Sequence, residues 1–273
     1  MDIIESAISV EKCTALVKAR ISRRLSVQPA IRVRAFAAAD TSSPTKELDA
    51  VVLANTLVGY GEKITLENMA IIENLIKFSK LEASFEVPGD DPEAWYLAFL
   101  KCMDEAGCFV ADSGYTVYQK SSYQLTMDNI VTDIVKAGMD AAKAAMPGAA
   151  VLSAVANTTL DALKEESEAI GLFNREVTGS KGVRLAVMPC DQLANGLIVT
   201  SLVSIDSVGG SQETAPLFFN WRTSGHDIFR GSSFITFNPI RYAALKNELE
   251  EYLGQFYKPL LQNRFNRRRN APK

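Results

Sequence analysis

Hydrophobic residues recur at helical spacing near the C-terminal end of the chain. Between Tyr242 and Phe256 the large apolar side chains fall within one narrow arc of a helical wheel at about 100° per residue. Asn238 is a good N-cap, and Pro239 suits the first helical position. The pattern predicts an amphipathic helix that covers one face of a sheet.

Between residues 183 and 237 the helical spacing gives way to short runs rich in β-branched and aromatic residues. Turn residues such as Asn195-Gly196 separate the runs, and the connections are too short for helical crossovers. The pattern therefore predicts an antiparallel meander. Its strands are expected at Val183 to Met188, Leu197 to Ile205, Pro216 to Trp221 and Ile228 to Phe237.

The N-terminal part of the chain is predicted to be mainly helical. Capping signals at Thr65 and at Asp91-Pro92 predict helices that end near Leu81 and Gly107. Two β-prone runs around Asp112-Ser113-Gly114 indicate a short hairpin. Two further helices are expected at residues 3–25 and from Ser43-Pro44 to about Val58, and residues 31–39 fit either strand or helix.

Residues 126–170 contain the longest uncharged run of the chain, from Ala144 to Leu160. Thr126 is expected to cap an amphipathic helix that ends before Met146-Pro147-Gly148, and residues 149–156 of the next helix carry no charge on any side. Such a helix is either buried in protein or placed in lipid, so two interpretations remain open: a buried central helix, or an apolar hairpin that is released into a membrane. The candidate membrane-inserting residues are Ile130, Ile134, Val135, Met146, Pro147, Gly148, Val151, Leu152 and Val155.

Length limits the membrane interpretation. A helix over residues 148–163 would measure about 24 Å at 1.5 Å per residue, and a hydrocarbon core is roughly 30 Å thick. The hairpin would therefore lie at the interface, or span the bilayer after joining neighbouring turns. In its organisation, the region resembles α-helical pore-forming toxins, in which amphipathic helices surround an apolar hairpin; the likeness is one of pattern, without a sequence motif.

These elements together predict an α+β protein. Its N-terminal two-thirds would be mainly helical around an apolar central helix pair, followed by an antiparallel β meander and a C-terminal amphipathic helix. The expected regions, within one compact domain overall, are 1–125 (helices with a short β hairpin), 126–175 (central hairpin), 176–260 (sheet and C-terminal helix) and 261–273 (basic tail).

The net charge of −3 is unevenly distributed, because both ends of the chain are basic and the body is acidic. The basic ends either contact anionic lipid or neutralise the acidic body of this chain or of a neighbouring subunit. The acidic body also argues against nucleic acid as the main partner. The basic candidates for lipid or partner contact are Arg20, Arg23, Arg24, Arg32, Arg34, Arg267, Arg268 and Arg269.

Candidate catalytic chemistry is sparse. The single histidine, His226, precedes Asp227 in a predicted turn, where the two side chains seldom form the hydrogen bond that a catalytic triad needs. Cys102 and Cys108 are six residues apart, whereas zinc sites use closer pairs and four ligands. With no phosphate-binding motif either, we expect no cofactor and no metal.

Three functional hypotheses follow. The first is a non-enzymatic, membrane-active protein, toxin-like or an effector, with an anionic membrane as partner. The second is an oligomeric scaffold or self-assembling protein whose basic ends dock on an acidic body, and the third is an enzyme of unrecognised type. Asp2 and Glu5 occupy the place of a basic signal-peptide region, so we expect cytoplasmic synthesis with reduced thiols, and export by another route or release stays open.

Overall fold

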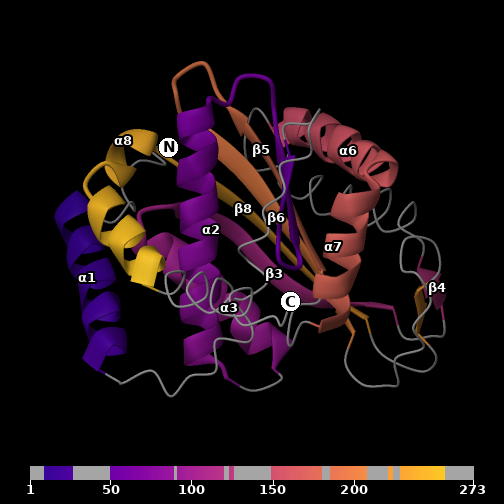
Figure 1. The fold of residues 1–273 in the computed structure, drawn as a ribbon, viewed down its shortest axis with the longest axis horizontal. Helices are drawn as coiled ribbons and strands as arrows, with labels where there is room; N and C mark the ends of the chain where they lie inside the picture. The colour runs from indigo at the N-terminus through magenta and orange to yellow at the C-terminus, as the bar shows by residue number, and fades with distance from the viewer. Residues whose placement is uncertain are drawn as a thin grey trace, which may run out of the picture.

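The computed structural model describes residues 9–26, 50–88, 91–119, 123–125, 149–179, 185–207, 221–223 and 228–255. Within these residues, helices cover both faces of one sheet, so the fold has three layers (Figure 1). Helices and a mixed sheet occur together, which confirms the α+β class that the sequence predicts.

Six strands of the described part of the chain form the main sheet, in the order β1-β2-β5-β6-β8-β3. They are β1 (Ala50–Leu53), β2 (Thr56–Tyr60), β3 (Phe109–Gln119), β5 (Leu185–Gln192), β6 (Ile198–Ser207) and β8 (Ile228–Phe237). Strands β2 and β5 are parallel, and the other neighbours are antiparallel. Both edges of the sheet therefore come from the first half of the chain, and its centre comes from the second half.

A tight turn joins the two central strands β5 and β6, as the sequence predicts. Gly196 has a φ of 86°, in the left-handed region that glycine adopts without strain. The Leu197 amide donates a hydrogen bond to Asn195 Oδ1 at 3.1 Å. The Asn195-Gly196 pair thus sets the register in which Gln192 faces Ile198.

The larger hydrophobic core lies on one face of the sheet, beneath helices from both ends of the chain. These elements are α1 (Val10–Ser26), α2 (Leu66–Glu86), α3 (Pro92–Glu105), α8 (Pro239–Tyr242) and the helical residues 246–255. Thr65, Asp91 and Asn238 each accept a backbone N–H at the start of a helix, which confirms the three predicted caps. Helix α2 continues past the predicted end at Leu81 to Glu86, because its buried face extends to Ala83.

The second core lies on the opposite face of the sheet, beneath α6 (Ala149–Glu165) and α7 (Ser167–Gly179). Alternation along the strands separates the two cores, because successive side chains point to opposite faces. In β1, for example, Val51 and Leu53 belong to the larger core, and Val52 belongs to the second. A small separate sheet pairs β4 (Tyr123–Leu125) with β7 (Trp221–Thr223).

The helix expected from Ser43 to Val58 is absent from its described part, which instead forms β1 and most of β2. Ala54, with a φ of 53°, and Asn55 turn the chain between the two strands. All four residues of β1 and all five of β2 are buried, so this segment needs cover on both faces. A short apolar run buried on both faces cannot be distinguished from a helix by periodicity.

The hairpin expected around Asp112-Ser113-Gly114 is also wrong. Residues 109–119 form one continuous strand that pairs with β8, and its register shifts between Ala111 and Gly114. The turn-forming residues therefore occupy a β-bulge, which adds residues to one strand of a pair. The sheet also differs from a purely antiparallel meander, because β3 lies beside β8 and β2 lies parallel to β5.

Candidate functional site

Helix α6 contains the described part of the predicted membrane hairpin, and its inner side packs on the sheet. Leu152, Leu160 and Leu163 are at most 1% exposed in the second core. Thr159 lies against Gly59 of β2 so closely that an added Cβ at Gly59 would sit 2.9 Å from the Thr159 Cβ. The helix and the strand therefore meet without a side chain from Gly59 between them.

The outer side of α6 is exposed and carries no charge in its first turns. Val151 is 38% exposed, and Ala154, Asn157 and Thr158 are exposed with it. The first charged residue along the helix is Asp161. The helix that appeared apolar on all sides in the sequence thus divides into a buried leucine side and an exposed side of small, uncharged residues.

The structure places only part of the predicted hairpin. Val151 is exposed, Leu152 is buried and Val155 is half-buried. Ile130, Ile134, Val135, Met146, Pro147 and Gly148 lie outside the described residues. Within the described part of the chain, no helix is both long enough and apolar enough to cross a membrane.

Lys80 is a buried cation that the sequence interpretation missed. It lies on α2, and its ammonium donates hydrogen bonds to Leu53 O at 3.0 Å, Asn55 Oδ1 at 2.6 Å and Thr56 Oγ1 at 2.9 Å. Burial lowers the pKa of Lys80 to about 7, and the nearby carboxylate of Glu176 on α7 opposes this shift. The side chain therefore holds the turn between β1 and β2 beneath α2.

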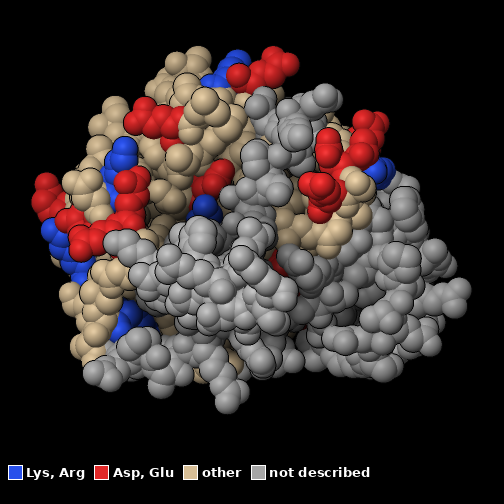
Figure 2. All heavy atoms as spheres, in the orientation of Figure 1, with Lys and Arg blue, Asp and Glu red and all other residues tan. Residues whose placement is uncertain are grey.

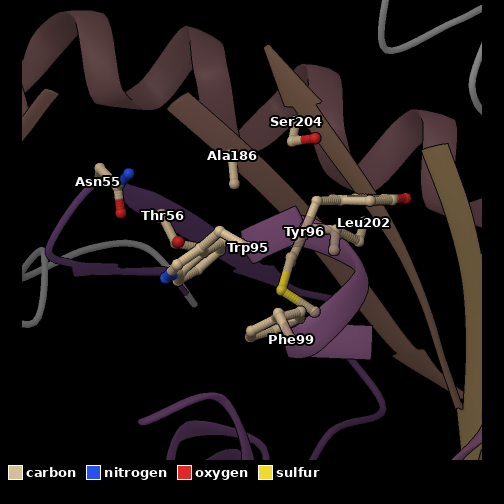
Figure 3. A pocket seen from close by; sticks show the side chains of 9 residues that line it. Asn55, Thr56, Trp95, Tyr96, Phe99, Ala186, Leu202 and Ser204 are labelled. Carbon is tan, nitrogen blue, oxygen red and sulfur yellow. The ribbon is translucent and has the colours of Figure 1, made fainter. Parts of the chain in front are cut away.

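We call Lys80 and its three hydrogen-bond acceptors, from Leu53, Asn55 and Thr56, the Lys80 cage. Next to it, a small cavity lies between α3 and the sheet (Figure 3). Its walls include Trp95 and Tyr96 of α3, and Asn55 and Thr56, which also bind Lys80. The cavity volume is about 10 Å³, which leaves room for about one water molecule. Ser204 also lines it, and the buried Ser204 hydroxyl has no hydrogen-bond partner among the described residues.

The chain matches no protein-family model, no curated protein and no solved structure. Its function therefore has to be inferred from the arrangement of its own residues. Two buried features contain charged side chains with several polar partners each: Lys80 with its three hydrogen-bond acceptors, and an ion-pair cluster between helices.

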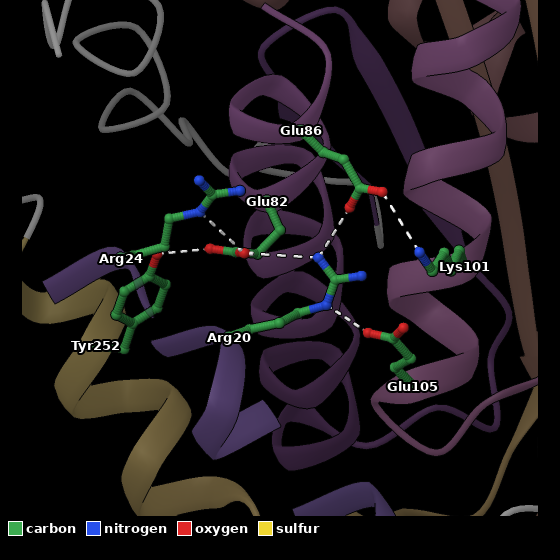
Figure 4. Close-up of polar contacts among 7 residues, drawn as sticks. All are labelled: Arg20, Arg24, Glu82, Glu86, Lys101, Glu105 and Tyr252. Atoms are coloured by element: carbon green, nitrogen blue, oxygen red, sulfur yellow. Dashed lines mark hydrogen bonds and ion pairs between the residues drawn. The ribbon is translucent and has the colours of Figure 1, made fainter. Parts of the chain in front are cut away.

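The ion-pair cluster joins α1, α2, α3 and the helical residues 246–255 (Figure 4). Arg20 is 5% exposed and is paired with Glu82, Glu86 and Glu105. Glu82, itself fully buried, also contacts Arg24 Nε at 3.4 Å and accepts a hydrogen bond from Tyr252 at 2.6 Å. Burial alone would lower the pKa of Arg20, but the hydrogen bonds with Glu105 and Glu86 outweigh it and raise that pKa.

These contacts define what the described basic candidates do within the chain. Arg20 and Arg24 are engaged with acidic residues of α2 and α3, and Lys18 pairs with Glu248 at 2.8 Å. Arg23 is exposed. Arg32, Arg34, Arg267, Arg268 and Arg269 lie outside the described residues. Arg20 and Arg24 therefore fit the interpretation in which the basic N-terminal part neutralises acidic residues of the same chain.

The four cysteines are all buried, and none of them forms a disulfide. Burial raises the pKa of Cys102 and Cys190 to about 12, and it raises the pKa of Cys13 and Cys108 as well. A thiolate is the reactive form, so these thiols are chemically quiet in the folded protein. Within the described residues, no group of three or more histidine, cysteine or carboxylate side chains could hold a metal ion. His226 lies outside them.

The sequence does not single out the residues of either buried polar feature. Lys80 and Glu82 belong to a stretch, residues 71–83, in which Glu73, Asn74, Lys77 and Ser79 are also polar. Charged side chains are expected to be paired when buried, but the sequence does not show which of these are buried. Their partners could not be predicted, because Arg20 comes from a distant helix and Asn55 from a turn in a segment expected to be helical.

Proposed function

We propose that the protein is a non-enzymatic, membrane-active protein whose segment from Ile130 to Val155 enters or lies in lipid. The observation that carries this proposal is the separation of the two cores on opposite faces of the sheet. Helices α6 and α7 cover one face only. They can leave it while the larger core, with α2, α3 and α8, stays packed.

The charge distribution of α6 supports this role. A helix approaches lipid most easily with an uncharged side, and from Val151 to Thr158 the exposed side of α6 has none of the charged groups that resist transfer. The acidic residues of the layer instead gather where α6 meets α7, as the red atoms on the right of Figure 2 show. The early turns of α6 and the segment before them would therefore make the contact.

The energetic cost of leaving the sheet falls mainly on the strands. Leu152, in the early turns of α6, gains roughly 1.5–3 kcal/mol from burial, but it keeps apolar surroundings when it moves into lipid. The sheet face beneath α6 would lose its apolar surroundings, because Val187, Val199 and their neighbours would no longer be covered. The proposal therefore requires that lipid, or another copy of the chain, also covers this face.

Dye release from vesicles of phosphatidylcholine and phosphatidylserine tests the proposal. Val151→Asp adds a charge at an exposed position, so the variant should fold normally while insertion costs roughly 3 kcal/mol more. Leu97→Asp on α3 is the matched control, because Leu97 is also exposed, at 49%, and lies on the other layer. Circular dichroism checks that both variants are folded.

We expect the wild-type protein and Leu97→Asp to release dye, and Val151→Asp to release it far more slowly. Release should be weaker from vesicles of phosphatidylcholine alone, because anionic lipid attracts basic residues. The absence of release by the wild-type protein would overturn the proposal. Equal release by folded Val151→Asp, or an equal loss in both variants, would overturn the assignment to α6.

A further inference from the structure

A shallow groove separates the start of α2 from α8 and the helix that follows it. Its volume is about 90 Å³. A hydrogen bond from Asn74 Nδ2 of α2 to the hydroxyl of Tyr242, which lines the groove, joins α2 and α8 at 3.0 Å. The groove is lined by Glu67, Ala70, Ile71, Pro239, Tyr242, Ala243, Lys246 and Glu250. We call it the α2–α8 groove.

Two large apolar residues are almost fully exposed, and each is next in the sequence to a residue that lines this groove. Leu66 precedes Glu67 and is 82% exposed, and Ile240 follows Pro239 and is 80% exposed. The other exposed large apolar residues of the described chain lie between 38% and 51%. Leu66 lies on α2 and Ile240 on α8, so a protein seated in the groove between these helices would cover apolar surface from both sides.

The charges of the groove have both signs. Glu67, Lys246 and Glu250 are all exposed, and they form no ion pair with one another or with other described residues. Figure 2 shows blue and red atoms close together over this upper left part of the molecule. In a two-fold dimer the same patch of both copies meets, so a basic residue of one copy can face an acidic residue of the other, and the reverse.

We propose that two copies of this chain associate through the α2–α8 groove around a two-fold axis. Leu66 and Ile240 of each copy are covered by the other copy. Lys246 of each copy faces Glu67 and Glu250 of the second copy, so the same contacts form twice. This association is independent of the membrane role, because it uses the opposite layer of the fold.

The groove fits a second copy better than a drug-sized ligand, a nucleic acid or an anionic membrane. Its volume is well below the roughly 300–1,000 Å³ of pockets that hold drug-sized ligands. Its mixed charges match neither the phosphates of nucleic acid nor an anionic lipid surface, which select for one sign of charge.

Sedimentation of the full chain, followed over a concentration series, tests the association. We expect a species of twice 29.8 kDa whose population rises with protein concentration. Leu66→Glu and Ile240→Glu should each weaken it at least about tenfold. Both substitutions place an acidic residue in the first turn of a helix, where it is favourable, so folding should be retained. Leu97→Glu on α3 should leave the association unchanged.

A charge exchange identifies the groove itself. Lys246→Glu makes the patch wholly acidic, and the double variant Glu67→Lys, Glu250→Lys makes it wholly basic. We expect each variant alone to be monomeric and an equimolar mixture to recover the dimer, less strongly as salt rises. A monomeric wild-type protein at all concentrations, a dimer that Leu66→Glu does not weaken, or variants that do not recover on mixing would each overturn the proposal.

Discussion

The position that a Cβ of Gly59 would occupy overlaps the side chain of Thr159, so β2 and α6 are in direct contact at this point. Gly171 of α7 differs, because no atom lies within 4 Å of the place that an added Cβ would occupy there. The two glycines therefore allow the same substitution to be compared at a crowded site and at an open site of the same layer.

Gly59→Ala should destabilise the protein by about 1–3 kcal/mol, because overpacking forces α6 away from the strand. Adding Thr159→Gly should recover part of this loss, although glycine within a helix costs about 1 kcal/mol. Gly171→Ala should instead stabilise the protein by up to about 1 kcal/mol. Urea unfolding is measured for the wild type, Gly59→Ala, Thr159→Gly, the double variant and Gly171→Ala, and strictly additive effects at residues 59 and 159 would contradict the contact.

Lys80 should make stability depend on pH. Burial lowers the pKa of Lys80 to about 7 in the folded chain, whereas an unfolded lysine has a pKa of about 10.4. Between these values the unfolded chain binds one more proton, so stability rises with pH by up to about 1.4 kcal/mol per unit. Below the folded pKa both states are protonated, and the full cost of burying the charge remains.

Lys80→Met isolates this contribution, because it keeps an unbranched apolar side chain and removes the ammonium. The difference in unfolding free energy between wild type and variant should shift in favour of the wild type as pH rises from 7. Subtracting the variant removes the contributions of tyrosines and cysteines, which titrate in the same range. A difference that stays flat from pH 7 to 10 would show that Lys80 keeps its ordinary pKa.

Arg20→Ala should be strongly destabilising, by about 3–5 kcal/mol, because it leaves buried carboxylate charge without its main partner. Lys101→Ala removes the exposed pair with Glu86, in which Lys101 is 59% exposed, and should cost less than about 1 kcal/mol. Hydrogen exchange of α1 checks the mechanism, since loss of Arg20 should speed exchange there before the sheet opens. Similar costs for the two variants would argue against a buried cluster.

The four thiols should react with a thiol reagent only when the protein unfolds. The pKa of Cys102 and Cys190 is raised to about 12, so at pH 8 the folded protein contains almost no thiolate at these positions. Reaction should follow the rate of global opening and become fast in denaturant. Rapid modification of one cysteine in native buffer would indicate a locally open segment around it.

The sequence predicts those parts of the fold that local chemistry determines. Thr65, Asp91 and Asn238 mark helix starts because each side chain satisfies a nearby backbone N–H. The Asn195-Gly196 turn is equally local. The exposed outer side of α6 was not predictable, since residues 149–156 contain nothing polar enough to indicate which side faces the sheet.

The missed elements depend on contacts between distant residues. Val58 belongs to a strand because β5, from the second half of the chain, lies beside it, and Val51 pairs in turn with Val58. The Asp112–Gly114 segment is a bulge because β8 offers a long partner for the whole of β3. The Lys80 cage and the Arg20 cluster depend in the same way on long-range packing.

The origin of the central strands has a consequence for synthesis. Strands β2 and β3 leave the ribosome well before β5, β6 and β8, which later separate them within the sheet. Until residue 185 has emerged, the inner edges of both strands lack their native partners, and such open edges pair readily with other chains. Nascent chains that stop before β5 should therefore aggregate or require a chaperone, and folding should be slow because its decisive contacts are non-local.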